Sequence, residues 1–557
     1  MAATMSQIRS WSPAAAATAS TGVVAVNNEF RTAMSQASRA VDTALAGWQG
    51  DAATATDLRR LEYELSANHI SAAVIDAADA LADAATLTTV CTTILAIETE
   101  AKAKGCAVND DGTVTAAVSN TGDLVLDTVF QASLDNEAAG FQARIQPLLV
   151  TAGTTDEKAG AKLSAAIASL VGLAQNPQGT PASSKVTDVI NGNAFLPDDP
   201  KGMYEFWESL SPSDKDLLFA YDPNVGNRDG IPAVEKDHYN RLNLVNLQTS
   251  AQSTLDNLNG QHPDWAAGQN PPVKASAAAE YELWNEARTK QQNLLNGYKA
   301  VDTQINQTTP PRYLLSVDDA GHGAIALNNP DAAKNVATYV PGTFARLEEI
   351  GDGVERSQAM LNSAENAGGR GNTSVIAWYG YDAPQSLFPQ AAQESFADNG
   401  APTLDRFQDG LRATHDGPAS NNTVVGHSYG STVIGHAASH GNSLAVDNVV
   451  FVGSPGVDVD RATDLHLDGV PTDQNKGRIF ATAASADPVP QIGGIAHGMP
   501  PSEKYFGATV FESSSGSVAD LPIIRDFPQG SDAHGSYWDP NNPGLRSQGR
   551  IIAGAQS

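Results

Sequence analysis

Residues 422–437 constrain the fold of this chain more than any other stretch. The pair Val424-Val425 is apolar and typical of a buried strand, and the five residues that follow, from Gly426 to Gly430, have the pattern Gly-x-Ser-x-Gly with Ser428 at the centre. A helical stretch begins at once. A serine hydroxyl is a poor nucleophile at neutral pH, so it must be presented rigidly to a general base, and a sharp strand-to-helix turn flanked by glycines does this. Ordinary glycine-rich turns also contain these five letters, but the flanking strand and helix favour Ser428 as a nucleophile.

The acid of such a site is expected after the nucleophile along the chain. Asp487 follows the apolar stretch 478–483, the second predicted strand beyond the nucleophile strand. An acid in that position would hold the imidazole in one tautomer and stabilise the imidazolium. The alternative is an aspartate that only begins a turn before Pro488. Asp458, which follows the predicted strand 448–453, is the reserve candidate for the acid.

The general base is expected among the histidines that follow the nucleophile, which are His436, His440, His466, His497 and His534. The first two lie on the helix after the turn and should point away from the reactive end. His466 and His497 precede the last predicted strand, 507–511. His534 alone follows it, in a loop of small residues that could swing the ring between the serine and the acid. His534 is therefore the predicted base, and His497 is its main rival.

Backbone N–H groups should stabilise the negative charge that develops on an acyl intermediate. The Tyr429 N–H, at the N-terminus of the helix after the turn, is one predicted donor. The second is expected from the loop after the predicted strand 335–340, where Gly342 allows a close approach of the backbone and the N–H of Thr343 or Phe344 would donate. A plain Pro-Gly turn that ends the strand is the alternative.

Beyond Pro310-Pro311, short apolar and β-branched stretches alternate with helix-length segments. Most of these strands are continuously apolar, as a parallel sheet covered on both faces requires. The first two, joined by a short polar link, are expected to form an antiparallel hairpin. The fold class is therefore α/β, preceded by a large all-α region. The predicted strands are 312–317, 323–327, 335–340, 374–378, 422–426, 448–453, 478–483 and 507–511.

The first 306 residues are rich in alanine and predict helices. Apolar residues recur at helical spacing over 5–46 and 52–104, and a polar, turn-rich connection with a small hairpin is expected at 105–125. We divide the chain into 1–125, a helical region 126–306 that could form a lid or bundle, and a catalytic domain 307–557. The further helices are expected at about 126–150, 155–174, 201–220, 230–256 and 274–306.

The composition argues against several classes of partner. The formal charge is −29, from 63 acidic and 34 basic residues, and such a field repels nucleic acid. The most apolar windows are too short and interrupted to predict a transmembrane segment, and the N-terminus does not resemble a secretory signal. The two cysteines, Cys91 and Cys106, suit no metal site by their spacing, and they could form one disulfide or remain two buried thiols.

Several motifs resemble an actinobacterial alpha/beta-hydrolase family long catalogued as a domain of unknown function. An upstream stretch, NVGNRDGIP at 224–232 with Asn240-Arg241 after it, is similar to that family too, so the resemblance covers about 200–557. It implies the alpha/beta-hydrolase fold and a triad of Ser428, Asp487 and His534, and it implies little about substrate. The other motifs are VPGT (340–343), AWYGYDAP (377–384), VVGHSYGS (424–431), VFVGSPGVDV (450–459), ASADPVP (484–490) and DAHGSYW (532–538).

The N-terminal helices resemble the small WXG-type proteins exported by type VII secretion. Trp48-Gln49-Gly50 lies between the two predicted helices, as the W-x-G turn does in that family. The resemblance implies pairing with another helical-hairpin protein and export to the envelope or medium without a signal peptide. The stretch 298–302 has the letters of the export tail, Tyr-x-x-x-Asp, but lies far beyond the second helix. An ordinary helical hairpin in a cytoplasmic protein is the alternative.

Together these features predict a serine hydrolase that cleaves carboxylic esters through an acyl-enzyme and needs no metal or cofactor. The envelope setting of the resembling family makes lipids or other lipophilic esters the expected substrates. One alternative is acyl transfer, in which an alcohol other than water resolves the acyl-enzyme. Another is a type VII-secreted effector, toxin or docking protein whose hydrolase domain is lipolytic or inactive.

Overall fold

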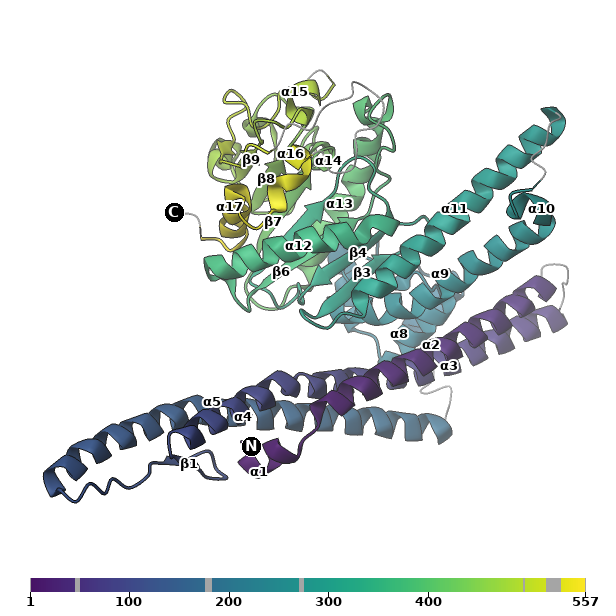
Figure 1. Ribbon diagram of the computed structural model, residues 1–557. Helices are drawn as coiled ribbons and strands as arrows, with labels where there is room; N and C mark the ends of the chain where they lie inside the picture. The colour runs from purple at the N-terminus through teal and green to yellow at the C-terminus, as the bar shows by residue number, and fades with distance from the viewer. Residues whose placement is uncertain are drawn as a thin grey trace. The chain divides into compact units, whose positions relative to one another are not determined.

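The computed structural model of the protein describes residues 2–45, 51–175, 183–269, 275–493, 496–516 and 532–555. The chain forms two compact units, Met1–Pro181 and Ala182–Ser557. Each unit is described by itself. Figure 1 shows that the first consists almost wholly of long helices and that the second contains the sheet.

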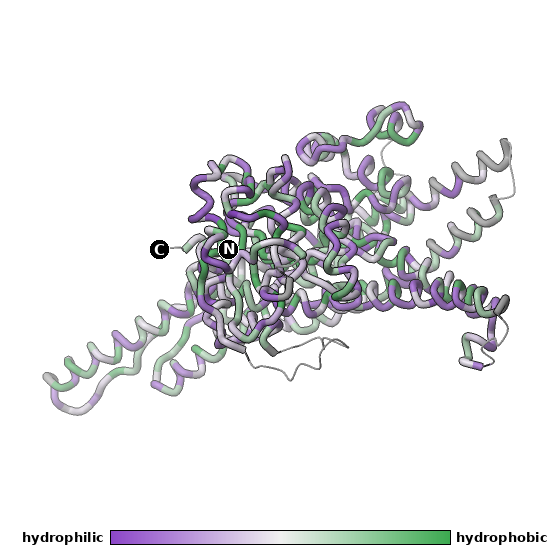
Figure 2. Tube along the Cα trace, turned by 90° about the horizontal axis from the view of Figure 1, so that it is seen from above, coloured by the Kyte–Doolittle hydropathy of each residue, from purple (hydrophilic) through white to green (hydrophobic). Residues whose placement is uncertain are grey.

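The first unit is built from long helices that pack along one another. Helices α2 and α3 lie side by side, and α5 packs against both α3 and α4 (Figure 1). In Figure 2, hydrophobic and hydrophilic residues are interspersed along the long helices. The elements are α1 (Met5–Ser10), α2 (Pro13–Leu45), α3 (Asp51–Ala85), α4 (Leu87–Ala103), β1 (Ala107–Val108), β2 (Val114–Thr115) and α5 (Leu124–Gln175).

The first unit differs from the expected helices in its breaks. Each of the two predicted N-terminal helices is divided, the first before Pro13 and the second at Thr86, whereas the two helices expected within 126–174 form one continuous helix, α5. The predicted small hairpin is present, with Val108 paired to Val114 in the antiparallel ladder of β1 and β2. The predicted W-x-G turn at Trp48-Gln49-Gly50 lies outside the described residues, so it remains a prediction.

Both cysteines are free and buried. They belong to one apolar cluster formed by α1, α4, the β1–β2 hairpin and the first half of α5, which includes Ile94 and Ile145. Of the two alternatives left open by the sequence, the structure therefore has two buried thiols that pack as small apolar groups.

One helical stretch of the described residues, Ser66–Ala103, is long and apolar enough to cross a membrane by length and composition. It spans α3 and α4, and 28% of its most apolar window is buried. Helices in the core of a soluble bundle meet the same criterion, because they are also long and apolar. The expectation that the chain has no transmembrane segment therefore stays a prediction.

The second unit begins with short helices, continues with a long helical hairpin and ends in an α/β region. Helices α9 and α11 run from the sheet as two adjacent arms, with α10 at their far end (Figure 1). The helices are α6 (Ser184–Ile190), α7 (Pro200–Glu208), α8 (Pro212–Tyr221), α9 (Ala233–Gln261), α10 (Pro263–Ala266), α11 (Ala275–Ile305), α12 (Ile350–Ala364), α13 (Ser395–Thr414), α14 (Gly430–Ala437), α15 (Val489–Gly493), α16 (Asp532–Gly535) and α17 (Pro543–Ile552), with a 3-10 turn η1 (Val225–Asn227) before α9.

The sheet has eight strands in the order β10-β9-β8-β7-β5-β6-β4-β3. Strands β6, β5, β7, β8, β9 and β10 are parallel neighbours, and β3 and β4 form the predicted antiparallel hairpin at one edge. This confirms the predicted alpha/beta-hydrolase fold class. The strands are β3 (Arg312–Val317), β4 (Gly323–Leu327), β5 (Asn335–Val340), β6 (Thr373–Tyr379), β7 (Asn421–His427), β8 (Asn448–Val452), β9 (Ile479–Thr482) and β10 (Thr509–Val510).

Both faces of the sheet are covered, which explains why β4, β6 and β8 are buried at every position. Successive side chains of a strand point to opposite faces, so Val424 packs with α13 and α14 on one face, and Val425 packs with α11, α12 and α17 on the other. The nucleophile strand β7 therefore lies in the middle of the unit, with two hydrophobic layers holding it.

The upstream motif protects the exposed edge of β3. An edge strand presents unpaired backbone groups, which must find other partners. Asn227 bonds to both backbone groups of Val317, accepting from its N–H and donating to its C=O, each at 2.8 Å. Asp237 accepts from the Leu314 N–H at 2.7 Å, and Asn240 donates to the Leu314 carbonyl at 3.2 Å. Side chains of η1 and α9 thus replace a further strand.

These contacts explain why neither predicted domain boundary coincides with the division between the compact units. The boundary expected near 307 falls inside the second unit, because α9 and α11 pack on β3 and β4. The boundary expected at 125 falls inside the first unit, because α5 packs along α3 and α4. The region 126–306 is therefore divided between the two units at residues 181 and 182.

Replacement of Asn227 by alanine should destabilise the second unit. Both backbone groups of Val317 would lose their partners, and leaving buried polar groups unsatisfied costs about 1–3 kcal/mol. We expect a lower urea midpoint for Asn227→Ala. The control is Asn362→Ala on the exposed side of α12, which should change stability by no more than about 0.5 kcal/mol. Equal midpoints for the two variants would contradict the edge-protecting role.

Candidate active site

Ser428 lies in the turn between β7 and α14. Its φ angle is +53°, a left-handed conformation that non-glycine residues rarely adopt. Such strain persists only where the surrounding structure holds it, and it is common at functional sites. The backbone N–H of Ser428 donates to the Val452 carbonyl at 3.0 Å, which fixes the turn to β8. The side chain is largely buried, with 9% of the residue exposed.

Two glycines permit the close packing around this turn. A Cβ atom at Gly430 would lie 2.3 Å from the Val340 carbonyl oxygen, at the end of the adjacent strand β5. A Cβ atom at Gly342 would lie 2.6 Å from the Ser428 Cβ and 3.0 Å from the Tyr429 nitrogen. The loop after β5 therefore contacts the serine turn directly, at distances that only glycine allows.

The predicted oxyanion donors adjoin this contact, since Thr343 follows Gly342 and Tyr429 follows Ser428. The Phe344 N–H is already used, since it donates to the Pro384 carbonyl at 2.7 Å. Within the described residues, neither the Tyr429 N–H nor the Thr343 N–H donates a hydrogen bond. Of the two alternatives for the second donor, Thr343 is the one that remains available to a ligand. Buried N–H groups usually have partners, so two available donors beside a serine indicate a site for an anionic oxygen.

Asp487 and His534 form a hydrogen-bonded pair. Asp487 follows β9 and is 2% exposed, and its Oδ2 lies 2.8 Å from the Nδ1 of His534 on α16. Two further donors hold the carboxylate: the Tyr537 hydroxyl donates to Oδ2 at 2.6 Å, and the Val489 N–H donates to Oδ1 at 2.9 Å. The Tyr537 oxygen in turn accepts from the Ala484 N–H at 2.9 Å. The acid is thus fixed in position before any substrate binds.

This pair lies beside the serine turn. A Cβ atom at Gly453, the residue after the Ser428 partner Val452, would lie 2.8 Å from Asp487 Oδ2 and 3.2 Å from His534 Cε1. Within the described residues no hydrogen bond joins the Ser428 hydroxyl to His534. In enzymes without substrate this contact is commonly long and tightens in the complex. The structure therefore brings Ser428, Asp487 and His534 to one end of the parallel strands.

The partners of the ring nitrogens separate His534 from its rivals. The two ring nitrogens of His436 face Asp398 and Asp458, at 2.9 and 2.8 Å. The ring nitrogens of His497 face Asp458 at 3.2 Å and the Ala391 carbonyl at 2.7 Å. An imidazole donates from both nitrogens only when it carries two N–H groups, and it then has no free nitrogen to accept a proton. Among the described residues, His534 has an acceptor at Nδ1 only, which favours it over the other two as a base.

His427, the residue before the serine, was overlooked in the sequence. Its Nε2 donates to the His534 carbonyl at 3.0 Å, and the two rings lie 4.5 Å apart between centroids. Burial, with help from the charges of His534 and Arg356, holds the pKa of His427 well below its usual value. A neutral His427 can hold the backbone of His534 by this hydrogen bond. It does not compete with the His534 ring for the proton of the serine hydroxyl. In the sequence, the only feature that points to His427 is its position between Gly426 and Ser428.

Comparison with known proteins identifies the family of this chain. A family model described as alpha/beta hydrolase matches residues 318–496. The uncharacterized protein Rv2079 of Mycobacterium tuberculosis is 32% identical over 311 residues, which cover 52% of this chain and 44% of that protein. The uncharacterized protein Mb0988c of Mycobacterium bovis is 33% identical over 230 residues, which cover 40% of this chain and 80% of that protein.

The chain belongs to the alpha/beta-hydrolase family. It spans less than half the length of Rv2079. No solved structure matches the chain. The relatives are themselves described as uncharacterized, so they indicate no substrate.

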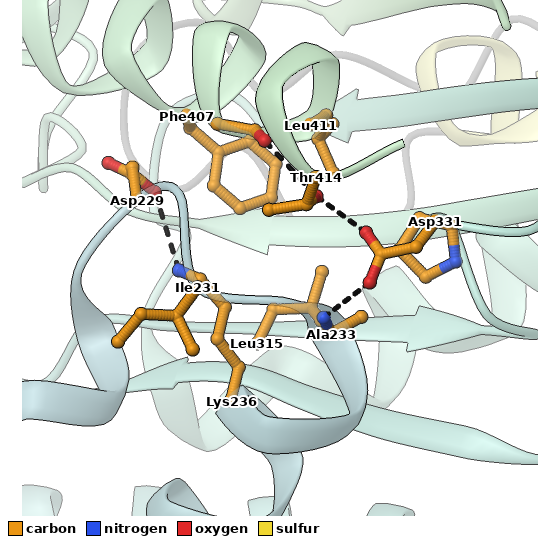
Figure 3. A pocket seen from close by; sticks show the side chains of 11 residues that line it. Asp229, Ile231, Ala233, Lys236, Leu315, Asp331, Phe407, Leu411 and Thr414 are labelled. Atoms are coloured by element: carbon orange, nitrogen blue, oxygen red, sulfur yellow. Dashed lines mark hydrogen bonds and ion pairs between the residues drawn. The ribbon is translucent and has the colours of Figure 1, made fainter. Parts of the chain in front are cut away.

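A small pocket of the hydrolase unit lies away from Ser428. Its lining includes the buried Asp331, which accepts from the Ala233 N–H and the Thr414 hydroxyl, each at 2.6 Å (Figure 3). Burial raises the pKa of Asp331. Asp331 precedes β5, so the pocket is at the opposite ends of the parallel strands from the serine. Its volume of about 10 Å³ is room for roughly one water.

Among the residues that the structure describes, no group of three or more His, Cys, Asp or Glu side chains is arranged to hold a metal ion.

Replacement of Tyr537 by phenylalanine should weaken the site. Asp487 would lose one donor, and the Ala484 N–H would lose its acceptor. A hydrogen bond to a charged group contributes about 1.5–3 kcal/mol. The rate at which a fluorophosphonate labels Ser428 should therefore fall roughly tenfold or more. The matched control is Tyr239→Phe, which removes a buried tyrosine donor to Asp216 on α8. An equal effect of both variants would indicate a loss of stability rather than a role at the acid.

Proposed function

We propose that this protein is a serine hydrolase that cleaves carboxylic esters. The observation that carries the proposal is the Asp487–His534 pair, bonded at 2.8 Å, beside a serine held at a positive φ angle at the end of a parallel strand. Ser428 is the proposed nucleophile, His534 the general base and Asp487 the group that orients it. The N–H groups of Tyr429 and Thr343 are the proposed oxyanion donors.

In the first half of the reaction, the Ser428 oxygen attacks the ester carbonyl carbon. Its proton passes to Nε2 of His534, and the carbonyl oxygen becomes an oxyanion between the two N–H donors. Asp487 stabilises the imidazolium through the bond to Nδ1. The carbon–oxygen bond to the alcohol then breaks, and the alcohol leaves with the proton from His534. The product is an acyl ester of Ser428.

In the second half, water takes the place of the alcohol. His534 accepts a proton from water as its oxygen attacks the acyl carbon, and it returns the proton to the Ser428 oxygen as the acyl bond breaks. The carboxylic acid leaves and the enzyme is restored. Ester and water give alcohol and acid, with no change in oxidation state and no demand for a cofactor.

Neutral, lipophilic esters are the proposed substrates. The formal charge of −29 disfavours the approach of anionic substrates. The segment after β6, which adjoins the loop of Thr343, carries Leu387, and next to it Phe388 is 71% exposed. Such side chains suit contact with an acyl chain rather than with a charged group.

Reaction of the purified protein with a fluorophosphonate probe tests the proposal. The wild type should be labelled, Ser428→Ala should not be, and labelling of His534→Ala should fall by roughly 10³-fold or more, because members of a triad act as a unit. Mass spectrometry should locate the label on Ser428. A labelled wild type should also release acid and alcohol from p-nitrophenyl esters.

The chain offers a control with the same two residue types. The Ser439 hydroxyl lies 2.8 Å from Nδ1 of His440, but it is not in a strand-to-helix turn and has no acid behind the histidine. Ser439→Ala should therefore be labelled like the wild type. A folded wild type that resists the probe, or a label on Ser439, would overturn the proposed function.

A further inference from the structure

Residues 384–394, called the bridging segment below, join β6 to α13 and touch both elements that carry the proposed oxyanion donors. At one end the Pro384 carbonyl accepts from the Phe344 N–H at 2.7 Å, one residue beyond Thr343. At the other end the Gln393 carbonyl accepts from the Tyr429 hydroxyl. The position of this segment is therefore coupled to the geometry of both donors.

A buried histidine holds the middle of the bridging segment. His497 is 1% exposed, and its Nε2 donates to the Ala391 carbonyl at 2.7 Å. Its ring packs edge-on against the Tyr429 ring, with 5.4 Å between centroids. His497 thus contacts both the bridging segment and the residue that follows the nucleophile, although it takes no part in the proposed chemistry.

A charged network fixes His497 from behind. Asp458, held at a φ angle of +55°, accepts from Nδ1 of His497 at 3.2 Å and from Nε2 of His436 at 2.8 Å. His436 also bonds to Asp398 on α13, and its ring is 5.6 Å from that of His440. Glu394 is a further acidic group near His497. Two imidazoles therefore share one buried carboxylate.

The partners decide the charge of this network. Burial opposes ionisation of His497 and His436, but their bonds to Asp458 outweigh it and raise the pKa of both. The same bonds, again against burial, lower the pKa of Asp458 to about 2. The raised pKa values favour rings that carry two N–H groups, and in that form His497 donates to Asp458 and to Ala391 at the same time.

We propose that His497 is a positioning residue for the esterase reaction, which holds the bridging segment through the Ala391 carbonyl while Asp458 fixes its ring. This inference rests on the proposed function. Its consequence is a loss of activity at alkaline pH. A neutral imidazole has a single N–H, so deprotonated His497 must give up either Asp458 or Ala391. The contact is complete below the ordinary pKa of histidine and is lost as the pH rises through the raised value.

Two amide variants of His497 separate the effect of the hydrogen bond to Ala391 from the effect of the charge on the ring. A glutamine amide nitrogen reaches about as far as Nε2 and can still donate to Ala391, whereas an asparagine nitrogen lies near the position of Nδ1 and reaches only Asp458. Hydrolysis of p-nitrophenyl butyrate is followed from about pH 6 to pH 10 for the wild type, His497→Gln and His497→Asn. His415→Gln is the control, because His415 lies at the opposite ends of the strands, 3.4 Å from the Pro330 carbonyl.

The wild type should lose kcat/KM at the alkaline end of this range. His497→Asn should lose roughly tenfold at neutral pH, since a small misplacement of the catalytic geometry is enough for such a loss, and its acid limb should not move. His497→Gln should lose less and show a weaker alkaline decline, because its amide does not titrate. His415→Gln should follow the wild type throughout.

Tyr429→Phe gives a second test should the His497 variants unfold on thermal denaturation. It removes the hydroxyl that donates to Gln393 of the bridging segment and keeps the ring against His497, so it should also lower kcat/KM. An unchanged alkaline limb in His497→Gln, or equal losses in the two amide variants, would overturn the positioning role while the wild type stays active. An inactive wild type would instead overturn the proposed function itself.

Discussion

The parallel pairing of β5 with β7 is the contact on which the site depends. Val340 pairs with Gly426 at the ends of the two strands, so the loop after β5 and the turn after β7 begin side by side. Gly342 and Gly430 let these two turns approach to distances that a Cβ atom would forbid. The positions of the strained serine and of both N–H donors depend on this register of β5 and β7. A shift by one residue would turn every side chain of the strand to the other face.

Hydrogen-bond partners, rather than residue type, divide the histidines into different roles. His436 and His497 each have acceptors at both nitrogens and a raised pKa, whereas burial holds the pKa of His427 well below its usual value. Among the described residues, His534 has one acidic partner and one nitrogen without an acceptor, which is the arrangement that a general base needs. The same side chain can thus supply a base, a neutral donor or a fixed positive charge, since the surrounding acceptors set the number of its protons.

The helical region before the sheet is divided by its packing. Helices α9 and α11 complete the second unit, where Asn227, Asp237 and Asn240 supply the hydrogen bonds that a further strand would have made to β3. Helix α5 instead completes the first unit. Local helical periodicity is the same in both cases, because it reports which face of a helix is apolar and not the element against which that face packs.

The sequence by itself determined the strands, the α/β class, the serine in the strand-to-helix turn and the chain order of a candidate acid and base. Strand periodicity and turn chemistry are local properties. The sequence could not decide between Thr343 and Phe344, or between one disulfide and the two free thiols, because each depends on contacts between residues distant in the chain. The breaks in the N-terminal helices and the division between the two compact units depend on such contacts too. Only the tertiary structure brought Asp487, His534 and Tyr537 together and enclosed Asp458 between two imidazoles, and such burial and bonding set the charge of each group.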